Sequence, residues 1–502
     1  MRPNLLKRLL ICTFALTPCF SGLSTVTASA EGQAASAYEK KRIEYRAQLM
    51  KDDVTDDDLL IGSWFSFYSF ERDSFEDQLE QMAAAGINFN IFPKDFGGHS
   101  LFDAEYWTQI EQAYSQRNMV YLMTGGTNPE WVSIASEYAT GKDHCLGFYI
   151  KDEPTADALD TVARQSIAFR TADPSRFPLT NLFPSYAEED LLGGSYREYV
   201  EAYVKKVGAE NIGYLSHDNY PFLKNDQLRR SIFSDMEVLR SVAYENGKLK
   251  THAFTQSSAW SWTRMPNIDE MRWNAYGYLA YGFKALTWFN LVCPGTADND
   301  AEGFYDSLIY RDGTIRDPVL FESWSDLNWE IRGLSPILMN TDVSHAYHVV
   351  RNVSGVELLP KDFFLQPDSS LENDFIVSVL EPKTGNEEHI MIFNKNFTHK
   401  STKCLFQIDE SKGIEGIEYF DPLTGEYIPV DISGNTLGDS FRPGEGRLYR
   451  LSYGEEKMET TEATKEAQPK GKALPWIIGS LVAVGGAAIA TATTVILKRK
   501  KK

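Results

Sequence analysis

The feature that most constrains the fold is an eightfold alternation that begins at Leu59. Eight times, a short apolar run is followed by a polar turn and a longer stretch with helical spacing. Strands that alternate with helices form parallel sheets, and eight such units close into a (β/α)8 barrel. The predicted strands are Leu59–Phe67, Ile87–Phe92, Met119–Met123, Cys145–Ile150, Pro178–Phe183, Ile212–Ser216, Leu249–Thr255 and Ala285–Asn290.

An open, doubly wound parallel sheet is the alternative architecture for the same alternation. Such sheets carry a Gly-x-Gly-x-x-Gly motif after their first strand, and this chain has none there. After Thr341 the helical pattern ends, and short alternating runs are separated by turn sequences such as Asp421-Pro-Leu-Thr-Gly425. We therefore predict a TIM barrel over residues 38–340, followed by a C-terminal antiparallel β-sandwich over residues 341–453.

The first 30 residues have the pattern of a targeting segment. Cationic residues precede the apolar run Leu9–Leu16, and Ala28-Ser29-Ala30 provides the small residues of a cleavage site. This is typical of a secretory signal peptide over residues 1–30. An uncleaved membrane anchor is the alternative, and both predict that the rest of the chain is exported.

The C-terminal end has the pattern of a membrane anchor. Residues 454–473 are poor in bulky apolar side chains, which predicts a disordered stalk. Leu474–Leu497 carries no charge and is long enough for a transmembrane helix. The basic residues 498–502 then stay in the cytoplasm, so we expect a single-pass protein of the cell membrane with its body outside the cell.

Charge and cysteine content exclude several classes of function. The formal net charge of −20 repels nucleic acid, so no nucleic-acid partner is expected. Three cysteines remain after the signal peptide, and Cys145 and Cys293 fall at opposite ends of their predicted strands. We predict no disulfide framework, no metal site and no cofactor.

Two adjacent carboxylates end the fourth predicted strand, in Gly147-Phe-Tyr-Ile-Lys-Asp-Glu-Pro154. Barrel enzymes keep their reactive groups at the C-terminal ends of the strands. Glycoside hydrolysis needs one carboxylic acid to protonate the leaving oxygen, and a neighbouring negative charge raises the pKa of such an acid. We predict Glu153 as the general acid beside Asp152. The alternative is that both residues cap the helix that begins near Thr155.

The other candidate residues come from the same end of the remaining strands. Asp218 is predicted as a second catalytic carboxylate, with a simple turn as its alternative. Trp260 and Trp262 form a sugar platform or plug the mouth of the barrel, and His217 is a pH-tuned partner or a hydrogen-bonded wall residue. The full set of predicted substrate-binding residues is Lys94, Asn181, His217, Tyr220, Gln256, Trp260, Trp262, Trp288 and Asn290.

At Asp152-Glu-Pro154 the chain resembles the clan of retaining barrel glycosidases that includes the β-galactosidases of families 5, 35 and 42. Those families end strand four in Asn-Glu-Pro, so the resemblance implies that Glu153 is the acid/base. They place a nucleophilic Glu at the end of strand seven. This chain has Gln256 there, which cannot attack as a carboxylate.

Two further patterns supply a nucleophile in another way. The Asp-Glu pair is similar to hexosaminidases of families 20 and 123, in which the 2-acetamido group of the substrate attacks. That resemblance implies that Asp152 orients the group and Tyr220 binds its oxygen. An α-galactosidase-type pattern implies Asp152 as nucleophile and Asp218 as acid/base. All three keep the active centre in the same place. Together with the signal and anchor patterns, they predict a membrane-anchored extracellular glycoside hydrolase. The alternative is an inactive carbohydrate-binding surface protein, which Gln256 favours.

Overall fold

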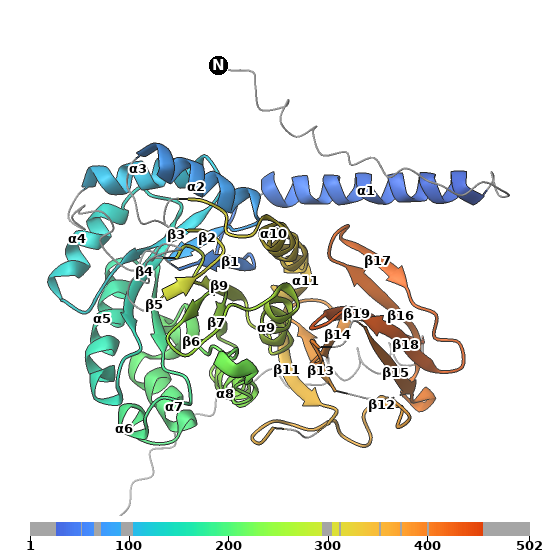
Figure 1. Cartoon of the computed structure of the whole chain (residues 1–502). Coiled ribbons are helices and arrows are strands. Elements are labelled where there is room, and N and C mark those ends of the chain that lie inside the picture. Colours follow the sequence, from blue (N-terminus) through green and yellow to red (C-terminus); the bar gives the residue numbers. More distant parts are fainter. Residues whose placement is uncertain are drawn as a thin grey trace, which may run out of the picture. The chain divides into compact units, whose positions relative to one another are not determined.

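Eight parallel strands form the closed barrel that the alternation predicts (Figure 1). The computed structural model describes residues 27–51, 53–64, 72–91, 104–293, 304–310, 313–350, 353–371, 374–398 and 401–454. Neighbouring barrel strands follow the chain order, and β9 closes on β1. These strands are β1 Leu60–Ser63, β2 Phe89–Ile91, β3 Val120–Thr124, β4 Cys145–Asp152, β5 Phe177–Leu182, β6 Tyr214–Asp218, β7 Lys250–Gln256 and β9 Ala285–Phe289.

Helices follow the barrel strands and begin at sequences that suit a helix start. Ser195 and Asn267 each form a capping box with a glutamate three residues later, which satisfies backbone N–H groups of the first turn. The helices are α2 Arg72–Ala84, α3 Ala104–Ser115, α4 Glu130–Ala139, α5 Leu159–Ala172, α6 Glu189–Leu192, α7 Tyr196–Val207, α8 Ile232–Glu245, α9 Ile268–Ala280, α10 Pro318–Gly333 and α11 Ser335–Leu338.

Several elements of the structure were not predicted from the sequence. The helix α1, Thr27–Lys51, begins inside the predicted signal peptide, and its Tyr45 hydroxyl donates to the carbonyl of Gly333 at 2.8 Å. The short strands β8, Ala259–Trp260, and β10, Phe304–Asp306, pair with each other outside the barrel. They lie in long loops, where local pairing rather than an apolar run defines the strand.

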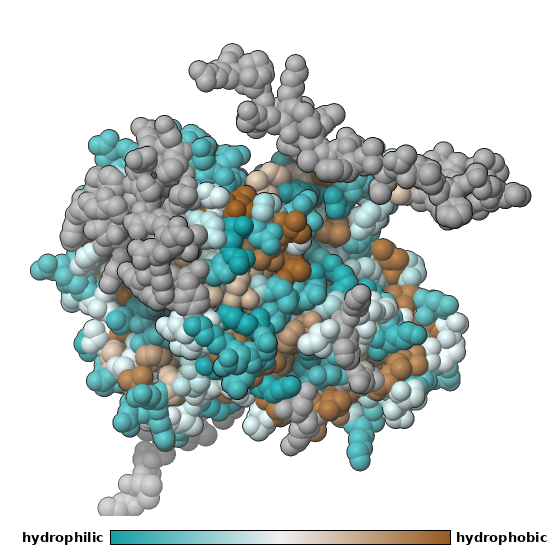
Figure 2. All heavy atoms as spheres, viewed as in Figure 1, coloured by the Kyte–Doolittle hydropathy of each residue, from teal (hydrophilic) through white to brown (hydrophobic). Residues whose placement is uncertain are grey.

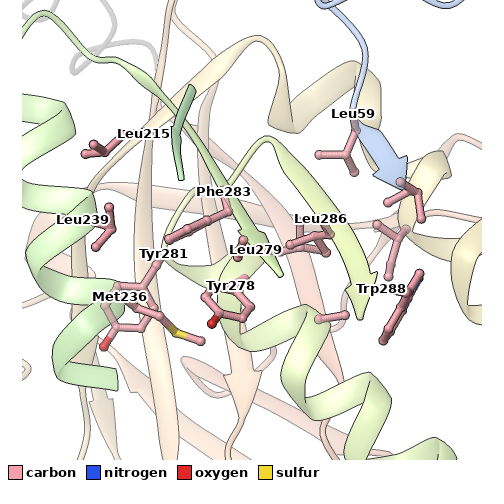
Figure 3. Packing of buried hydrophobic residues seen from close by; sticks show 14 of the residues in the cluster. Leu59, Leu215, Met236, Leu239, Tyr278, Leu279, Tyr281, Phe283, Leu286 and Trp288 are labelled. Carbon is pink, nitrogen blue, oxygen red and sulfur yellow. The ribbon is translucent and has the colours of Figure 1, made fainter. Parts of the chain in front are cut away.

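Alternate residues of each barrel strand face the lumen and the helices. Leu60, Phe89, Tyr149, Tyr214 and Phe254 belong to one buried cluster inside the barrel. The residues between them belong to a second, larger cluster that packs against the helices, part of which Figure 3 shows. Because the period of a strand is two, this alternation decides which side chains reach the barrel mouth.

The β-sandwich follows the barrel as predicted. A six-stranded sheet has the order β11-β13-β14-β19-β16-β17, and a three-stranded sheet has the order β12-β15-β18. Their facing sides share a buried cluster that includes Val377, Ile392 and Phe406. The strands are β11 Thr341–His348, β12 Leu365–Pro367, β13 Phe375–Pro382, β14 Glu388–Asn394, β15 Thr402–Ile408, β16 Ile414–Asp421, β17 Glu426–Pro429, β18 Thr436–Phe441 and β19 Gly446–Tyr453.

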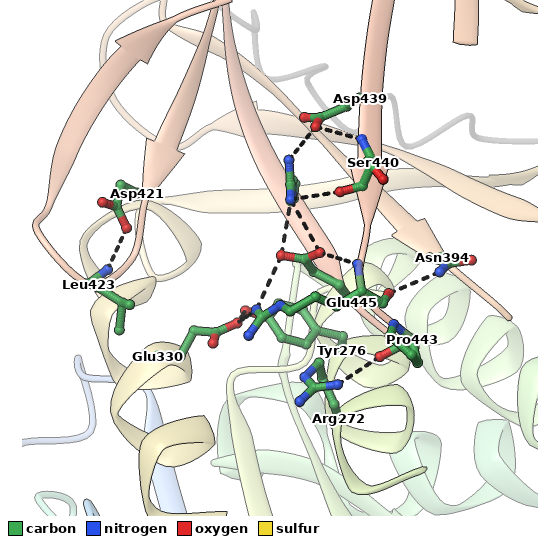
Figure 4. Close-up of polar contacts among 12 residues, drawn as sticks. Arg272, Tyr276, Glu330, Asn394, Asp421, Leu423, Asp439, Ser440, Pro443 and Glu445 are labelled. Atoms are coloured by element: carbon green, nitrogen blue, oxygen red, sulfur yellow. Dashed lines mark hydrogen bonds and ion pairs between the residues drawn. The ribbon is translucent and has the colours of Figure 1, made fainter. Parts of the chain in front are cut away.

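The other side of the six-stranded sheet belongs to the hydrophobic core of the barrel. Met391 and Phe393 of β14 lie in the same buried cluster as Trp273 of α9. Polar contacts surround this contact area (Figure 4). Glu330 of α10 accepts hydrogen bonds from the Tyr276 hydroxyl at 2.6 Å and from Arg442 at 2.8 Å. The sandwich is therefore packed onto the helices by burial and fixed in orientation by charge-assisted bonds.

Hydrophilic residues cover most of the described surface on the face shown in Figure 2, where hydrophobic residues occur in small separate groups. Within the described ranges, none of the helices combines the length and apolar character needed to cross a membrane. Outside those ranges lie the apolar core of the predicted signal peptide, the transmembrane helix and the basic tail, together with all of the predicted stalk except its first residue. Those assignments stay predictions.

The contact between β4 and β5 predicts a severe effect of one small substitution. A Cβ added at Gly147 would overlap the backbone carbonyl of Phe177 on the neighbouring strand. We expect Gly147→Ala to lower the free energy of unfolding by roughly 3 kcal/mol or more, measured by chemical denaturation. Gly438→Ala in β18 is the matched control, because its Cβ would make an ordinary contact at 3.5 Å with Leu405. Equal losses of unfolding free energy in both variants would show that the close approach of β4 and β5 is not the reason why residue 147 must be glycine.

Candidate active site

A cavity of about 220 Å³ opens at the C-terminal ends of the barrel strands. This is the end at which the sequence predicts the reactive groups. The cavity combines three carboxylates and one amide with a wall that consists mostly of aromatic rings. Its lining residues are Trp64, Asp152, Glu153, Asn181, Tyr186, Asp218, Tyr220, Phe254, Trp260, Trp262 and Phe289.

The turn that follows β4 places two consecutive carboxylates in the cavity. Glu153 has a φ of +41°, a left-handed conformation that is uncommon for a residue with a side chain. Its N–H donates to the carbonyl of Asn181 at 2.9 Å, and the carbonyl of Pro154 accepts from the Tyr199 hydroxyl at 2.5 Å. These bonds hold the strained turn. Unusual backbone of this kind is concentrated at functional sites.

The capping alternative for Asp152 and Glu153 is wrong. The residue that precedes the short helix over Ala156–Ala158 is Thr155, and no side chain makes a capping hydrogen bond there. Both residues line the cavity instead.

Asp152 is held by two hydrogen bonds to the same oxygen. Its Oδ1 accepts from the Tyr149 hydroxyl at 2.8 Å and from Asn181 Nδ2 at 3.1 Å. Burial raises the pKa of this carboxyl, and the two hydrogen bonds act in the opposite direction because they stabilise the charged form. The side chain still has an exposed surface, which faces the cavity.

Glu153 and Asp218 hold their protons more strongly. Burial and the adjacent charge of Asp152 raise the pKa of Glu153 to about 7. Burial, with the charges of Glu153 and Asp152, holds the pKa of Asp218 well above its usual range. Asp218 is 7% exposed, and its Oδ1 has no hydrogen-bond partner among the described residues. The site therefore contains one carboxyl group that two hydrogen bonds hold and two whose pKa burial and neighbouring charges raise, that of Glu153 to about 7.

Aromatic rings make up most of the rest of the cavity lining. The Trp260 ring makes edge contacts with Tyr220 at 4.7 Å, with Phe289 at 5.2 Å and with Trp262 at 5.4 Å between centroids. The Trp64 ring makes edge contacts with the rings of Tyr149 and Phe254. Rings of this kind supply the flat apolar faces on which a sugar ring stacks, and they exclude water from the acids.

An arginine connects three loops at one side of the cavity. The Arg229 guanidinium lies 3.5 Å from the ring centroid of Tyr186 and 4.6 Å from that of Trp262. It also donates to the carbonyl of Tyr220 at 3.0 Å. We call Tyr186, Arg229 and Trp262 the arginine clasp. Of the two predicted platform residues, Trp262 is engaged by this clasp, whereas Trp260 belongs to the wall.

Several predicted site residues lie elsewhere. Gln256 lines no part of the cavity, because its amide bonds the backbone of Phe222, Ser258 and Arg264 and so fixes two loops. His217 and Trp288 face outward from β6 and β9. His217 is hydrogen-bonded to Tyr196 at 3.1 Å, and Trp288 donates to Asn328 at 2.9 Å.

Of the two remaining predicted residues, Asn290 is not among those that line the cavity. Asn290 is fully buried, and its amide has no hydrogen-bond partner in the described structure. Lys94 lies outside the described residues. In the part of the chain that the structure describes, no three side chains are arranged to hold a metal ion.

Part of the cavity wall was not predicted from the sequence. Trp64, Tyr186, Phe254 and Phe289 line the cavity without having been candidates. A signal existed for Phe254 and Phe289, because each lies at the end of a barrel strand on the lumen side of the two-residue alternation. No comparable signal marks Tyr186, which lies in a loop.

Known proteins were compared with the chain at the levels of sequence and structure. No family model and no curated protein matches it in sequence. A β-galactosidase from Bacillus circulans sp. alkalophilus matches in structure, with a TM-score of 0.51 and 8% identity over 79% of this chain and 99% of that chain. The chain shares the barrel fold of this β-galactosidase, which confirms at the level of the fold the resemblance predicted from Asp152-Glu-Pro154. The reaction is argued from the site.

Two other solved structures match less closely. A glycoside hydrolase family 5 protein from Bacteroides vulgatus has a TM-score of 0.47 and 11% identity, over 79% of this chain and 89% of that chain. A family 42 β-galactosidase from G. stearothermophilus has a TM-score of 0.47 and 10% identity, over 79% of this chain and 98% of that chain.

The raised pKa of Glu153 predicts a pH-dependent effect on stability. The folded protein binds this proton more tightly than the unfolded chain, so its contribution is present below about pH 4.5 and is lost as the pH rises through about 7. We expect Glu153→Gln to raise the melting temperature by a few degrees at pH 8 and by less at pH 5. Glu137→Gln, on the exposed surface of α4, is the matched control. If Glu153→Gln changed the melting temperature by the same amount at pH 5 and at pH 8, the raised pKa of Glu153 would be refuted.

Proposed function

We propose that the chain is a glycoside hydrolase that acts outside the cell from a membrane anchor, with Glu153 as its general acid/base. The observation that carries the proposal is a carboxyl group with a pKa of about 7 at the mouth of a barrel, beside a hydrogen-bonded carboxylate and facing aromatic rings. The glycosidase fold of the structural neighbours supports it. The signal and anchor patterns of the sequence support the location.

The chemistry follows from the protonation states of the three acids. Protonated Glu153 donates its proton to the glycosidic oxygen as the bond between this oxygen and the anomeric carbon breaks. The positive charge that develops on the sugar ring is stabilised by the negative charge of Asp152. Glu153, now ionised, takes a proton from the water that completes hydrolysis.

The source of the attacking atom distinguishes two versions of this proposal. In one, the 2-acetamido oxygen of the substrate attacks, Asp152 orients this group and Tyr220 binds it. In the other, which is an alternative to Glu153 as acid/base, Asp152 attacks directly and Asp218, whose pKa is also raised, takes the acid/base role in place of Glu153. Gln256 is excluded from both, because its amide is engaged by backbone of two loops.

Hydrolysis of nitrophenyl glycosides tests the function. The panel contains galactosides, glucosides and 2-acetamido sugars in both anomeric forms, with the chain from Glu31 to Tyr453 as protein. Release confined to 2-acetamido sugars supports substrate assistance, and release from a plain galactoside supports attack by an aspartate. Glycan binding without any turnover, in the wild type and in Glu153→Gln alike, would instead support the carbohydrate-binding protein.

Loss of the acid at Glu153 should reduce turnover strongly. We expect Glu153→Gln to lower kcat by about 10²–10⁴-fold, and wild-type activity to fall above about pH 7, where Glu153 loses its proton. The loss should be smaller for a dinitrophenyl glycoside, because this leaving group needs less protonation. Initial rates between pH 4 and pH 9 measure both effects, with Glu137→Gln as control. An unchanged kcat would exclude Glu153 as the acid.

The wall residue Trp260 should act mainly on binding. We expect Trp260→Ala to raise KM about fivefold to tenfold, because the stacking face is lost, with a smaller change in kcat. Trp260→Phe keeps an aromatic face and should retain most of the affinity. A Trp260→Ala enzyme with wild-type KM would show that the ring does not contact the substrate.

A further inference from the structure

A continuous chain of hydrogen bonds crosses the lumen of the barrel and ends on Asp152. Thr287 Oγ1 lies 2.8 Å from His252 Nε2, and His252 Nδ1 lies 2.7 Å from Ser216 Oγ. Ser216 Oγ is 3.1 Å from Asn181 Oδ1, and Asn181 Nδ2 is 3.1 Å from Asp152 Oδ1. The five residues come from β9, β7, β6, β5 and β4, which are consecutive in the barrel.

This chain is fully enclosed by protein except at its end in the cavity. Thr287, Ser216 and His252 are at most 1% exposed, as is Asn181. His252, Ser216 and Thr287 were not predicted as site residues. His252 and Thr287 lie within predicted apolar strands, and Ser216 ends one without having been a candidate. Buried polar groups are usually paired, and here they are paired with one another and with Asp152 rather than with backbone groups of the strands.

The donors of the chain all point in one direction when Asp152 is ionised. A carboxylate only accepts, so Asn181 turns its Nδ2 toward Asp152 and its Oδ1 toward Ser216. The Ser216 hydroxyl therefore donates to Asn181 and accepts from His252 Nδ1–H. This leaves Nε2 as the acceptor for the Thr287 hydroxyl. Burial lowers the pKa of His252 to about 3, so the ring is neutral and carries the single proton that this arrangement requires.

We propose that His252, with Ser216 and Thr287, is a positioning residue that keeps Asp152 ionised and oriented in the reaction. This inference rests on the proposed function. The chain separates the roles of three crowded acids, because it stabilises the charged form of Asp152 alone. This chain of hydrogen bonds ends on Asp152, whereas burial is the largest cause that raises the pKa of its neighbours Glu153 and Asp218.

Other titratable groups lie near Asp152 and His252 in this chain of hydrogen bonds. Tyr149 donates to Asp152, and Lys151, Glu153 and Asp218 are its charged neighbours. The charge of His217 is the one that acts on His252. None of these groups replaces Ser216 as the partner that fixes the orientation of the Asn181 amide.

The tautomer of His252 tests the direction of donation along the hydrogen bonds, and this test needs no substrate. The full-length chain is labelled with ¹⁵N-histidine, and the signal of His252 is identified by its loss in His252→Asn. We expect a neutral ring with the proton on Nδ1 from pH 5 to pH 8. A proton on Nε2, or a charged ring in this range, would overturn the proposal, whether or not the protein cleaves any glycoside.

Two variants break the chain with little change in volume. Ser216→Ala removes the hydroxyl next to Asn181, so the amide is free to turn away from Asp152. Thr287→Val keeps the shape of Thr287 but loses its hydroxyl, and Thr287→Ser keeps the hydroxyl as the matched control. His348→Gln, a buried neutral histidine bonded to Tyr281 outside the barrel lumen, is the control for general loss of stability.

The pH profile of turnover is the decisive measurement for these variants. We expect Ser216→Ala to lower kcat about tenfold with little change in KM, and to move the acidic limb up by about one pH unit, because Asp152 is protonated more easily. Thr287→Val should show a smaller shift and Thr287→Ser none. If Ser216 had a purely structural role, Ser216→Ala would lower the melting temperature without shifting the acidic limb of the pH profile. That result would overturn the proposal.

A titration of ¹³C-labelled aspartate separates this inference from the proposed function. The carboxyl signal of Asp152, assigned by its loss in Asp152→Asn, should titrate at higher pH in Ser216→Ala than in the wild type. That result would stand even if no glycoside were hydrolysed, and the proposed function alone would then fail. Identical titrations in both proteins would overturn the positioning role of the chain.

Discussion

The mouth of the barrel depends on how one asparagine joins β4 to β5. Asn181 lies opposite Asp152 in the strand register, and its side chain donates to this carboxylate. Its backbone carbonyl accepts the N–H of Glu153. The same residue thereby orients the first acid and holds the second in a left-handed turn. Without the parallel register of two barrel strands, these two consecutive acids would have no fixed geometry.

The aromatic wall serves both acidity and recognition. Trp64, Tyr220, Phe254 and Phe289 exclude water from the carboxyl groups, and this desolvation is the largest cause of the raised pKa of Glu153 and of Asp218. The same apolar faces suit the faces of a sugar ring. A glycosidase that lost its stacking surface would therefore also lose part of the rise in pKa that keeps its general acid protonated near neutral pH.

The sequence predicted the barrel, the sandwich and the acids because each follows from local patterns. Apolar runs mark the strands, and the paired acids end one of them. The wrong placements of His217 and Trp288 share one physical cause, since consecutive strand residues face opposite sides. Asp218 faces the cavity, so His217 must face the helices. Gln256 has the right position along its strand, but its bonds to loop backbone depend on tertiary structure. The same is true of His252, whose partners come from other strands.

The shared core of barrel and sandwich limits how this protein can change in evolution. Met391, Phe393 and Leu448 of the sandwich complete the hydrophobic cluster that surrounds the barrel helices, and Gly333 of α10 lies against the backbone of Pro422. Modules joined only by a linker are exchanged freely between genes. Here an exchange would leave an apolar surface on both partners, so the two must be inherited and unfold as one cooperative unit.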